Sequence, residues 1–96
     1  MIRLTELERS AQSATVKAEG YLTATTLQVL AQTLAEYQQA GVAQVQLMAD
    51  GLQLIDPVAL EQALPQFPDN LKVSFHTSRL VVKQLLEDCG LTVVFH

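Results

Sequence analysis

The stretch VAQVQLMADGLQLIDPVAL, residues 42–60, predicts the architecture of the whole chain. Its first part, Gln44-Val45-Gln46-Leu47, alternates polar and apolar side chains, which is the period-2 pattern of a strand with one buried face. Its last part begins a helix, because the Asp56 carboxylate suits a helix cap and Pro57 suits the first helical position. Between them, Asp50-Gly51 has the composition of a turn.

The same two patterns recur on both sides of this stretch. Further strands are expected at residues 2–7, 15–19, 71–76 and 91–95, and the first two of these form a hairpin through the turn Ser10-Ala11-Gln12-Ser13. One more helix is expected from the capping box Thr25-Thr26-Leu27-Gln28 to Gly41. The helix that begins at Asp56 should stop at Pro65.

A last helix is expected between residues 77 and 90. Thr77 or Ser78 should cap it, and Gly90 lies beyond its end. Its expected apolar stripe consists of Val81, Val82, Leu85, Leu86 and Cys89.

This order of elements predicts an α/β fold. Helical connections between strands imply parallel crossovers, so we expect a mixed, mainly parallel sheet of four to five strands with about three helices. Polar residues such as Lys17, Gln46 and Ser74 occupy alternate strand positions, whereas a sheet buried on both faces has continuously apolar strands. Most of the helices should therefore cover one face of the sheet.

Composition limits the possible functions. With 96 residues, 49% of them hydrophobic and 17% charged, residues 1–96 are expected to form one globular domain. The net charge of −4, with no Lys or Arg between Ala18 and Leu71, argues against a nucleic-acid partner. The single cysteine makes no internal disulfide, and the first eight residues have no signal or membrane-spanning character. We therefore expect a cytoplasmic protein.

The sequence nominates no catalytic or metal site. His76 and His96 lie on different strands without metal-ligand spacing, so neither a metal nor another cofactor is expected. Cys89 lies on an apolar helix stripe, where a buried thiol is unreactive. Asp50 and Asp56 are explained as a turn residue and a helix cap rather than as an acid–base pair. The sequence therefore predicts that the protein is not an enzyme.

Several segments, in this order, resemble STAS domains, which include bacterial anti-sigma factor antagonists and the small STAS subunit of lipid-trafficking ABC transporters. The segments 16–22 (VKAEGYL) and 42–50 (VAQVQLMAD) are similar to two of the family's strands, and 52–56 (LQLID) leads to the next helix. The segment 78–91, with its Gly90-Leu91 exit, is similar to the family's closing helix. The resemblance implies a regulatory module that binds a protein partner.

The chain departs from this family where the regulatory members carry a phosphorylated hydroxyl. In those members Ser or Thr follows the aspartate that opens the second helix, whereas here Asp56 is followed by Pro57-Val58-Ala59. The resemblance therefore implies a non-catalytic interaction module without a phospho-switch. The partner-binding surface is expected to consist of Tyr21, Leu22, Thr23, Asp50, Leu52, Asp56, Pro57 and Val58.

Alternatives for the partner and the function remain open. The resemblance suggests an anti-sigma factor kinase-like protein or an ABC ATPase subunit, the second giving at most indirect membrane association through a transporter complex. Leu22, Leu52 and Val58 would instead close the ends of the core if this surface binds nothing. A small-ligand sensor that uses the polar strand face around Lys72, Ser74 and His76 is the other candidate function.

Overall fold

The computed structural model describes all 96 residues as a sheet packed against helices. The strands are β1 (Ile2–Arg9), β2 (Ser13–Leu22), β3 (Gln44–Ile55), β4 (Lys72–Thr77) and β5 (Val93–Phe95). The helices are α1 (Ala24–Gln39), α2 (Pro57–Ala63), the short 3₁₀ helix η1 (Leu64–Gln66) and α3 (Leu80–Asp88). No helix has the length and apolar character needed to cross a membrane.

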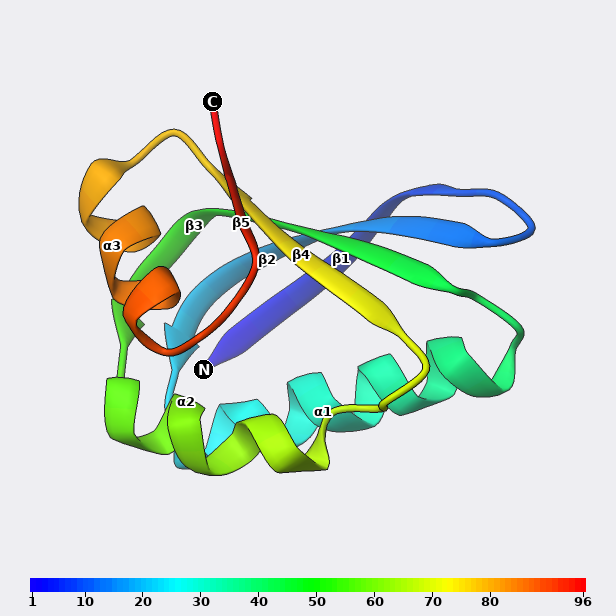
Figure 1. The fold of residues 1–96 in the computed structure, drawn as a ribbon, viewed down its shortest axis with the longest axis horizontal. Coiled ribbons are helices and arrows are strands. Elements are labelled where there is room, and N and C mark those ends of the chain that lie inside the picture. The colour runs from blue at the N-terminus through cyan, green and yellow to red at the C-terminus, as the bar shows by residue number, and fades with distance from the viewer.

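The five strands follow one another in the sheet in chain order, β1-β2-β3-β4-β5. β1 runs antiparallel to β2, and the other three pairings are parallel. Each parallel crossover moves to the next strand in the same direction. Because crossovers of this kind are right-handed, they place their helices on the same face of the sheet. This arrangement, visible in Figure 1, confirms the mixed, mainly parallel sheet with its helices on one face.

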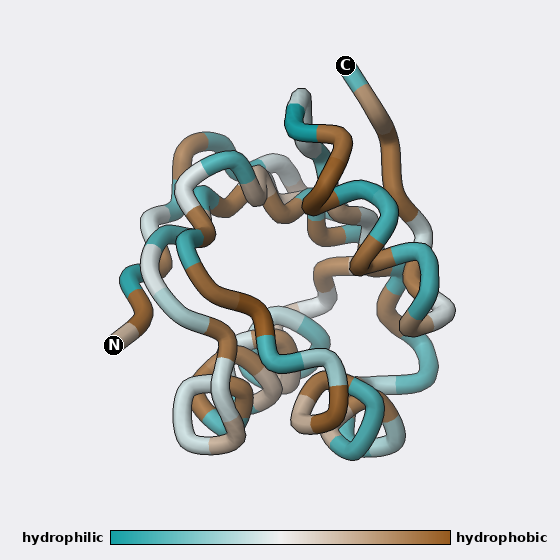
Figure 2. The backbone as a smooth tube through the Cα atoms, turned by 90° about the vertical axis from the view of Figure 1, so that its left-hand side faces the viewer, coloured by the Kyte–Doolittle hydropathy of each residue, from teal (hydrophilic) through white to brown (hydrophobic).

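The core lies between the sheet and this helical layer. Val16, Val45, Leu47 and Phe75 project from the strands and are buried. They belong to one cluster of twenty buried residues, which the helices complete through Leu27, Leu30, Leu34, Leu60, Val82 and Leu86. Seen from the side in Figure 2, α1 and α2 lie next to each other below the strands, and apolar segments occur in both layers.

The other face of the sheet is covered by no helix. Polar side chains from alternate strand positions lie on it, which is the arrangement expected from the sequence. In one lateral row the strand register places Lys17, Met48, His76 and Val94 next to one another. In the adjacent row the Thr15 hydroxyl donates to Gln46 Oε1 at 3.4 Å.

The two outermost strands of the sheet, β1 and β5, differ in length. β1 pairs only with β2, and its register shifts between Glu6 and Glu8, so that Leu7 is an extra residue in the strand. At the other end, β5 contains three residues. The hairpin turn between β1 and β2 is where the sequence predicts it, with Ser10 N–H donating to the Ser13 carbonyl at 2.8 Å.

Helix ends agree with the sequence in part. Gly41 and Gly90 follow α1 and α3 with φ of 89° and 87°, which is the left-handed conformation expected of a glycine that ends a helix. The helix that begins at Pro57 ends at Ala63, and Pro65 lies in η1. The expected cap of the last helix is wrong, because Arg79 occupies the cap position and no side chain there makes a capping bond.

Gly20 is needed where β1 begins beside the end of β2. It has φ of 105°, and a Cβ at this position would lie against the Met1 carbonyl, well inside contact distance. That carbonyl accepts a bond from Tyr21 N–H at 2.9 Å, so it has little freedom to move away. Gly41 has a similar φ of 89° but open space around its missing Cβ.

Gly20→Ala is therefore expected to destabilise the fold more than Gly41→Ala. The backbone conformation alone accounts for about 1–2 kcal/mol of unfolding free energy in each variant. The displaced start of β1 adds about 1–3 kcal/mol in Gly20→Ala only. Urea unfolding of the two variants and the wild type measures the difference, and equal losses would contradict the proposed steric role of Gly20.

Candidate functional site

The parallel strands end at one edge of the sheet, and the helices begin there. β2, β3 and β4 run in the same direction, so their carboxyl ends lie along this edge. The starts of α1, α2 and α3 follow these strand ends within a few residues. In sheets of this kind, the crevices outside the carboxyl ends of the strands are the usual place for binding sites.

The end of β2 combines an exposed aromatic side chain with a helix cap. Tyr21 is 44% exposed, whereas Leu22 is fully buried in the core. Thr23 caps α1, and Thr26 completes a capping box by accepting from Thr23 N–H at 2.8 Å. The capping box expected at Thr25–Gln28 is therefore wrong by two residues. The helix begins earlier because Thr23 directly follows the last residue of β2.

The end of β3 leads into the start of α2 as the sequence predicts. The Asp56 carboxylate accepts from Val58 N–H at 3.1 Å and from Ala59 N–H at 3.2 Å, with Pro57 in the first turn. Asp56 N–H also donates to the Leu22 carbonyl at 2.9 Å, which joins the ends of β2 and β3. Val58 follows this cap and is 63% exposed.

Asp50 does not lie in a turn but within β3. The register between β2 and β3 shifts at this point, so that Glu19 pairs with Gly51 where an unshifted register would give Asp50. The Asp50 carboxylate accepts from the Thr77 hydroxyl at 2.7 Å, from Ser78 N–H at 2.8 Å and from the Ser78 hydroxyl at 2.8 Å. These three bonds fasten the turn between β4 and α3 to the middle of β3.

Asp50 acts as an ionised acceptor near neutral pH. The bond from Thr77 and those from Ser78 lower the pKa of its carboxyl group below the usual value. A group that stays ionised in this way is a poor general acid. Asp50 therefore serves as an acceptor for the β4–α3 turn, and Asp56 is occupied as a helix cap.

Arg79 completes the same connection and was not identified in the sequence. Its guanidinium donates to the Leu52 carbonyl at 2.6 Å and to the Asp50 carbonyl at 3.3 Å. Leu52 itself is buried, with 1% exposed. No local pattern points to Arg79, because the carbonyl groups to which it donates lie far away in the chain.

Exposed apolar side chains surround this network. Val81 is 71% exposed, although the sequence placed it in the buried stripe of the last helix. It lines a shallow hollow of about 80 Å³ together with Gln53 and Ile55 from the end of β3. Leu54, which pairs with Tyr21 in the register, is 51% exposed, and Leu80 is 54% exposed. We call Tyr21, Leu54, Val58, Leu80 and Val81 the carboxyl-edge surface.

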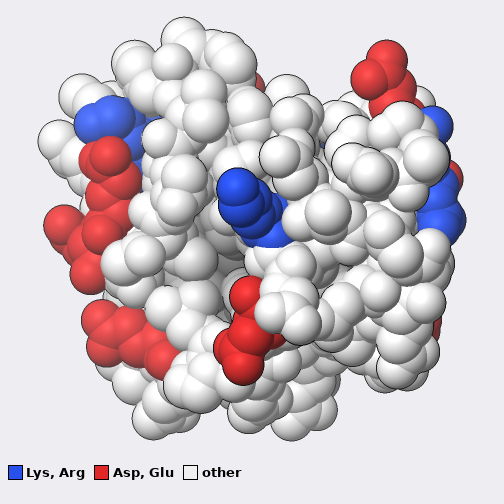
Figure 3. Space-filling view, turned by 45° about the vertical axis from the view of Figure 1, so that its right-hand side comes forward, with Lys and Arg blue, Asp and Glu red and all other residues white.

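Of the expected partner-binding residues, most have accessible side chains at this edge. Tyr21, Asp50, Asp56, Pro57 and Val58 are exposed and Thr23 is half-buried. Leu22 and Leu52 instead contribute their side chains to the core. Leu54, Leu80 and Val81 are exposed neighbours that sequence reasoning missed. Figure 3 shows another face of the molecule, formed largely by side chains other than Lys, Arg, Asp and Glu, with acidic side chains at the left margin, in the lower centre and at the upper right.

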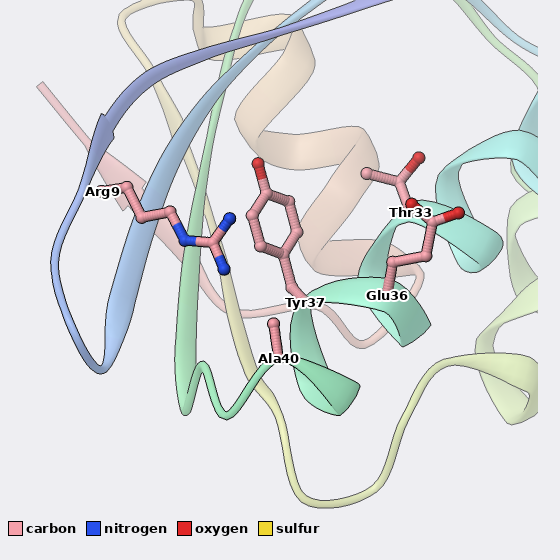
Figure 4. Close-up of a pocket in the computed structure, with 5 residues that line it drawn as sticks. All are labelled: Arg9, Thr33, Glu36, Tyr37 and Ala40. Carbon is pink, nitrogen blue, oxygen red and sulfur yellow. The ribbon is translucent and has the colours of Figure 1, made fainter.

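Polar side chains line hollows elsewhere on the molecule. Gln44, Lys72, Ser74 and Thr92 line an open hollow of about 460 Å³ at the uncovered sheet face. Another hollow, of about 210 Å³, lies beside Arg9, Glu36 and Tyr37 (Figure 4).

The polar side chains around Tyr37 interact with one another. Its hydroxyl donates to Glu6 Oε1 at 2.7 Å, and the Arg9 guanidinium lies 5.4 Å from the centre of its ring. Burial and the Glu6 bond raise the pKa of Tyr37 to about 12, so the phenol stays protonated and holds the hairpin against α1.

Cys89 and the histidines do not meet in a catalytic arrangement. Cys89 is buried, its thiol lies 3.8 Å from the Pro57 carbonyl oxygen, and burial raises the pKa of the thiol. His76 bonds instead to His96 and Ser74 on the uncovered sheet face. Nowhere do three or more His, Cys, Asp or Glu side chains converge as metal ligands would.

Replacing Asp50 is expected to weaken the fold in a pH-dependent way. Asp50→Asn loses the charge on the acceptor, and about 1–2 kcal/mol of unfolding free energy should be lost near neutral pH. The native pKa is lowered, so this contribution is complete above the unfolded value of about 4 and disappears as the pH falls through the native pKa. Urea unfolding of wild type and variant between about pH 2.5 and 7 should therefore show converging stabilities in acid.

Asp69→Asn provides the matched control for this prediction. Asp69 is an exposed aspartate in the loop before β4, and its side chain makes no hydrogen bond. Its replacement should change the stability by less than about 0.5 kcal/mol. A pH-independent loss in Asp50→Asn, or an equal loss in both variants, would disprove the anchoring role.

Comparison with known proteins identifies the fold. No protein-family model matches the sequence, and no curated protein matches it. Solved structures do match. The unphosphorylated anti-sigma factor antagonist SpoIIAA superposes with a TM-score of 0.70 at 11% identity, over 98% of this chain and 88% of that one. An anti-sigma factor antagonist from Mycobacterium paratuberculosis gives 0.69 at 10% identity, over 94% and 79% of the two chains.

The phosphorylated form of SpoIIAA, described as a Bacillus cell fate determinant, gives a TM-score of 0.65 at 7% identity. That match covers 98% of this chain and 91% of the other. Identities this low establish the architecture alone. The chain thus has the STAS-like α/β fold of these anti-sigma factor antagonists.

Proposed function

We propose that the protein is a non-catalytic regulatory module of the STAS type, which binds a protein partner through the carboxyl-edge surface. The observation that carries this proposal is the exposure of large apolar side chains at one edge of the sheet. Five of the ten exposed large hydrophobic residues form that surface. Concentrated apolar exposure on a small protein is typical of an interaction site.

The surface has the composition of a protein interface. Tyr21 offers an amphipathic ring, and aromatic side chains are enriched where proteins bind each other. Asp50 and Asp56 add negative charge at its margin, which favours a partner with a complementary basic patch. The Asp50 and Arg79 bonds fix the start of α3 relative to β3, so the surface is largely preorganised.

Binding at this surface is proposed to be constitutive. α2 begins with Pro57-Val58-Ala59, and none of these residues has a hydroxyl group that a kinase could phosphorylate. Val58 offers apolar contact area at the same helix start. The partner would thus recognise the unmodified helix start, without control by phosphorylation there.

We infer two candidate classes of partner. The solved anti-sigma factor antagonists of the same fold favour an anti-sigma factor kinase-like protein. The resemblance to the small STAS subunits of ABC transporters makes an ABC ATPase subunit the alternative. In both cases the module itself performs no chemistry and acts by occupying a surface of an ATP-binding protein.

Val58→Glu and Val81→Glu test the surface without disturbing the core. Both side chains are mostly exposed, so stability should change by less than about 0.5 kcal/mol. A buried carboxylate at the interface should weaken partner binding by about tenfold or more. Tagged wild type and variants are used to capture partners from the native host, and the binding of the recovered ATP-binding protein is then measured with purified components.

Val29→Glu is the matched control. Val29 is also a valine on a helix, 48% exposed, but it lies in the middle of α1 and away from the strand ends. The proposal expects this variant to bind the partner like the wild type. Equal binding by all four proteins would show that the partner uses another surface, and recovery of no partner by the wild type would contradict the function itself.

The polar hollow beside Lys72 and Ser74 supports a second candidate function, that of a small-ligand sensor. Its volume of about 460 Å³ would admit a small polar molecule, and Lys72 would favour an anion. A metabolite that binds there should raise the thermal midpoint of the wild type but not of Lys72→Ala. If no compound in a metabolite panel shifts the midpoint, the sensor function is rejected.

A further inference from the structure

The fold brings together the only two histidines of the chain, which are twenty residues apart in sequence. His76 lies on β4, and His96 directly follows β5, the strand next to it. His76 Nδ1 and His96 Nε2 are 3.0 Å apart, and the ring planes differ by 19°. Ring centres 5.2 Å apart at this nitrogen distance mean that the two nitrogens face each other, with the rings edge to edge.

The His76 ring and the backbone of His96 are held in place. His76 Nε2 lies 3.1 Å from the Ser74 hydroxyl, so this nitrogen can donate its proton to Ser74 and leave the Nδ1 lone pair directed at His96. His96 N–H donates to the Thr77 carbonyl at 2.9 Å, which extends the β4–β5 ladder and fixes the backbone of His96. His96 is exposed and His76 half-buried, so the site is open to solvent.

We propose that His76 and His96 form a binding site for a late first-row divalent metal ion such as Zn²⁺ or Cu²⁺. Imidazole nitrogens are preferred ligands of these ions, and ligating histidines usually donate their other N–H to a neighbouring group, as His76 can to Ser74. Two nitrogens bound to one tetrahedral ion at about 2.0–2.1 Å are about 3.3 Å apart. The observed 3.0 Å is close to this separation, and the exposed His96 ring must turn out of its present line with His76 so that both lone pairs point at one ion.

The surroundings set the character of this site. Met48 pairs with His76 in the register, so the neighbouring strand position carries no charge that would repel a cation. Lys17, next in the same row, is paired with Glu19 at 3.7 Å, which reduces its repulsion of a cation. With two imidazoles supplied by the chain, solvent fills the remaining positions, so the ion is bound reversibly. When neutral His96 binds the ion through Nε2, the proton on that nitrogen is lost to solvent and Nδ1 takes one up. The ring changes tautomer, and no proton is released overall.

Isothermal titration calorimetry with Zn²⁺ tests the site on the tag-free full chain. The wild type should bind one ion per chain, and His96→Asn should weaken binding by about tenfold or more, because it removes one of two ligands. His96 is exposed, so this variant is expected to keep the fold, which circular dichroism verifies. Ser74→Ala should weaken binding by about tenfold through loss of the group that orients His76.

Thr92→Ala is the matched control on the same sheet face and should bind Zn²⁺ like the wild type. Electron paramagnetic resonance with Cu²⁺ adds a readout of ligand identity, because two coordinated imidazoles give nitrogen hyperfine structure that His96→Asn should reduce. Equal Zn²⁺ affinity of wild type and His96→Asn, or no binding by the wild type, would overturn the proposal. The histidines would then only share a hydrogen bond.

Discussion

The structure depends on one constraint, the common direction and hand of its strand crossovers. Each crossover moves one strand further along the sheet, and right-handedness then assigns its helix to the same side each time. One face of the sheet is buried as a result, and the other keeps its polar side chains in water. The same constraint brings the starts of the helices to one edge, where the exposed apolar side chains gather.

Side-chain bonds connect the elements that this constraint brings together. Two side chains join the β4–α3 turn to β3. The Asp50 carboxylate on β3 accepts from Ser78 N–H, and the Arg79 guanidinium in the turn donates to the Leu52 carbonyl. Asp56 joins β3 to β2 through its backbone and begins α2 through its carboxylate. These polar groups are used up within the fold, so the edge offers apolar contact area and fixed charge but no free acid–base pair. The proposed protein-binding function rests on this arrangement.

Much of this architecture could be predicted from the sequence, because local signals and the fold agree. The helix exits at Gly41 and Gly90 and the start at Asp56-Pro57 are where short-range rules place them. Asp50-Gly51 shows where such rules fail, since pairing with β2 keeps the chain extended through a sequence typical of a turn.

The functional groups were harder to foresee, because their neighbours are far away in the chain. Val81 was assigned to the core from helical spacing, but α3 buries Val82 and Leu86, and Val81 lies outside that buried face. Arg79 and the two histidines acquire their partners only through the strand order. A periodic pattern shows which way a side chain points along its own element, and it contains no information about which strand lies beside it.

The irregular first strand and the short last strand have a consequence for behaviour at high concentration. Edge strands present unpaired backbone groups to which other chains can add and start aggregates. Here one edge is interrupted by the extra residue Leu7 between two glutamates, and the other offers three residues. Neither edge is a good template for further strands. At high concentration the sheet of one molecule therefore offers little to which the sheet of another could add, even though apolar side chains are exposed elsewhere on the surface.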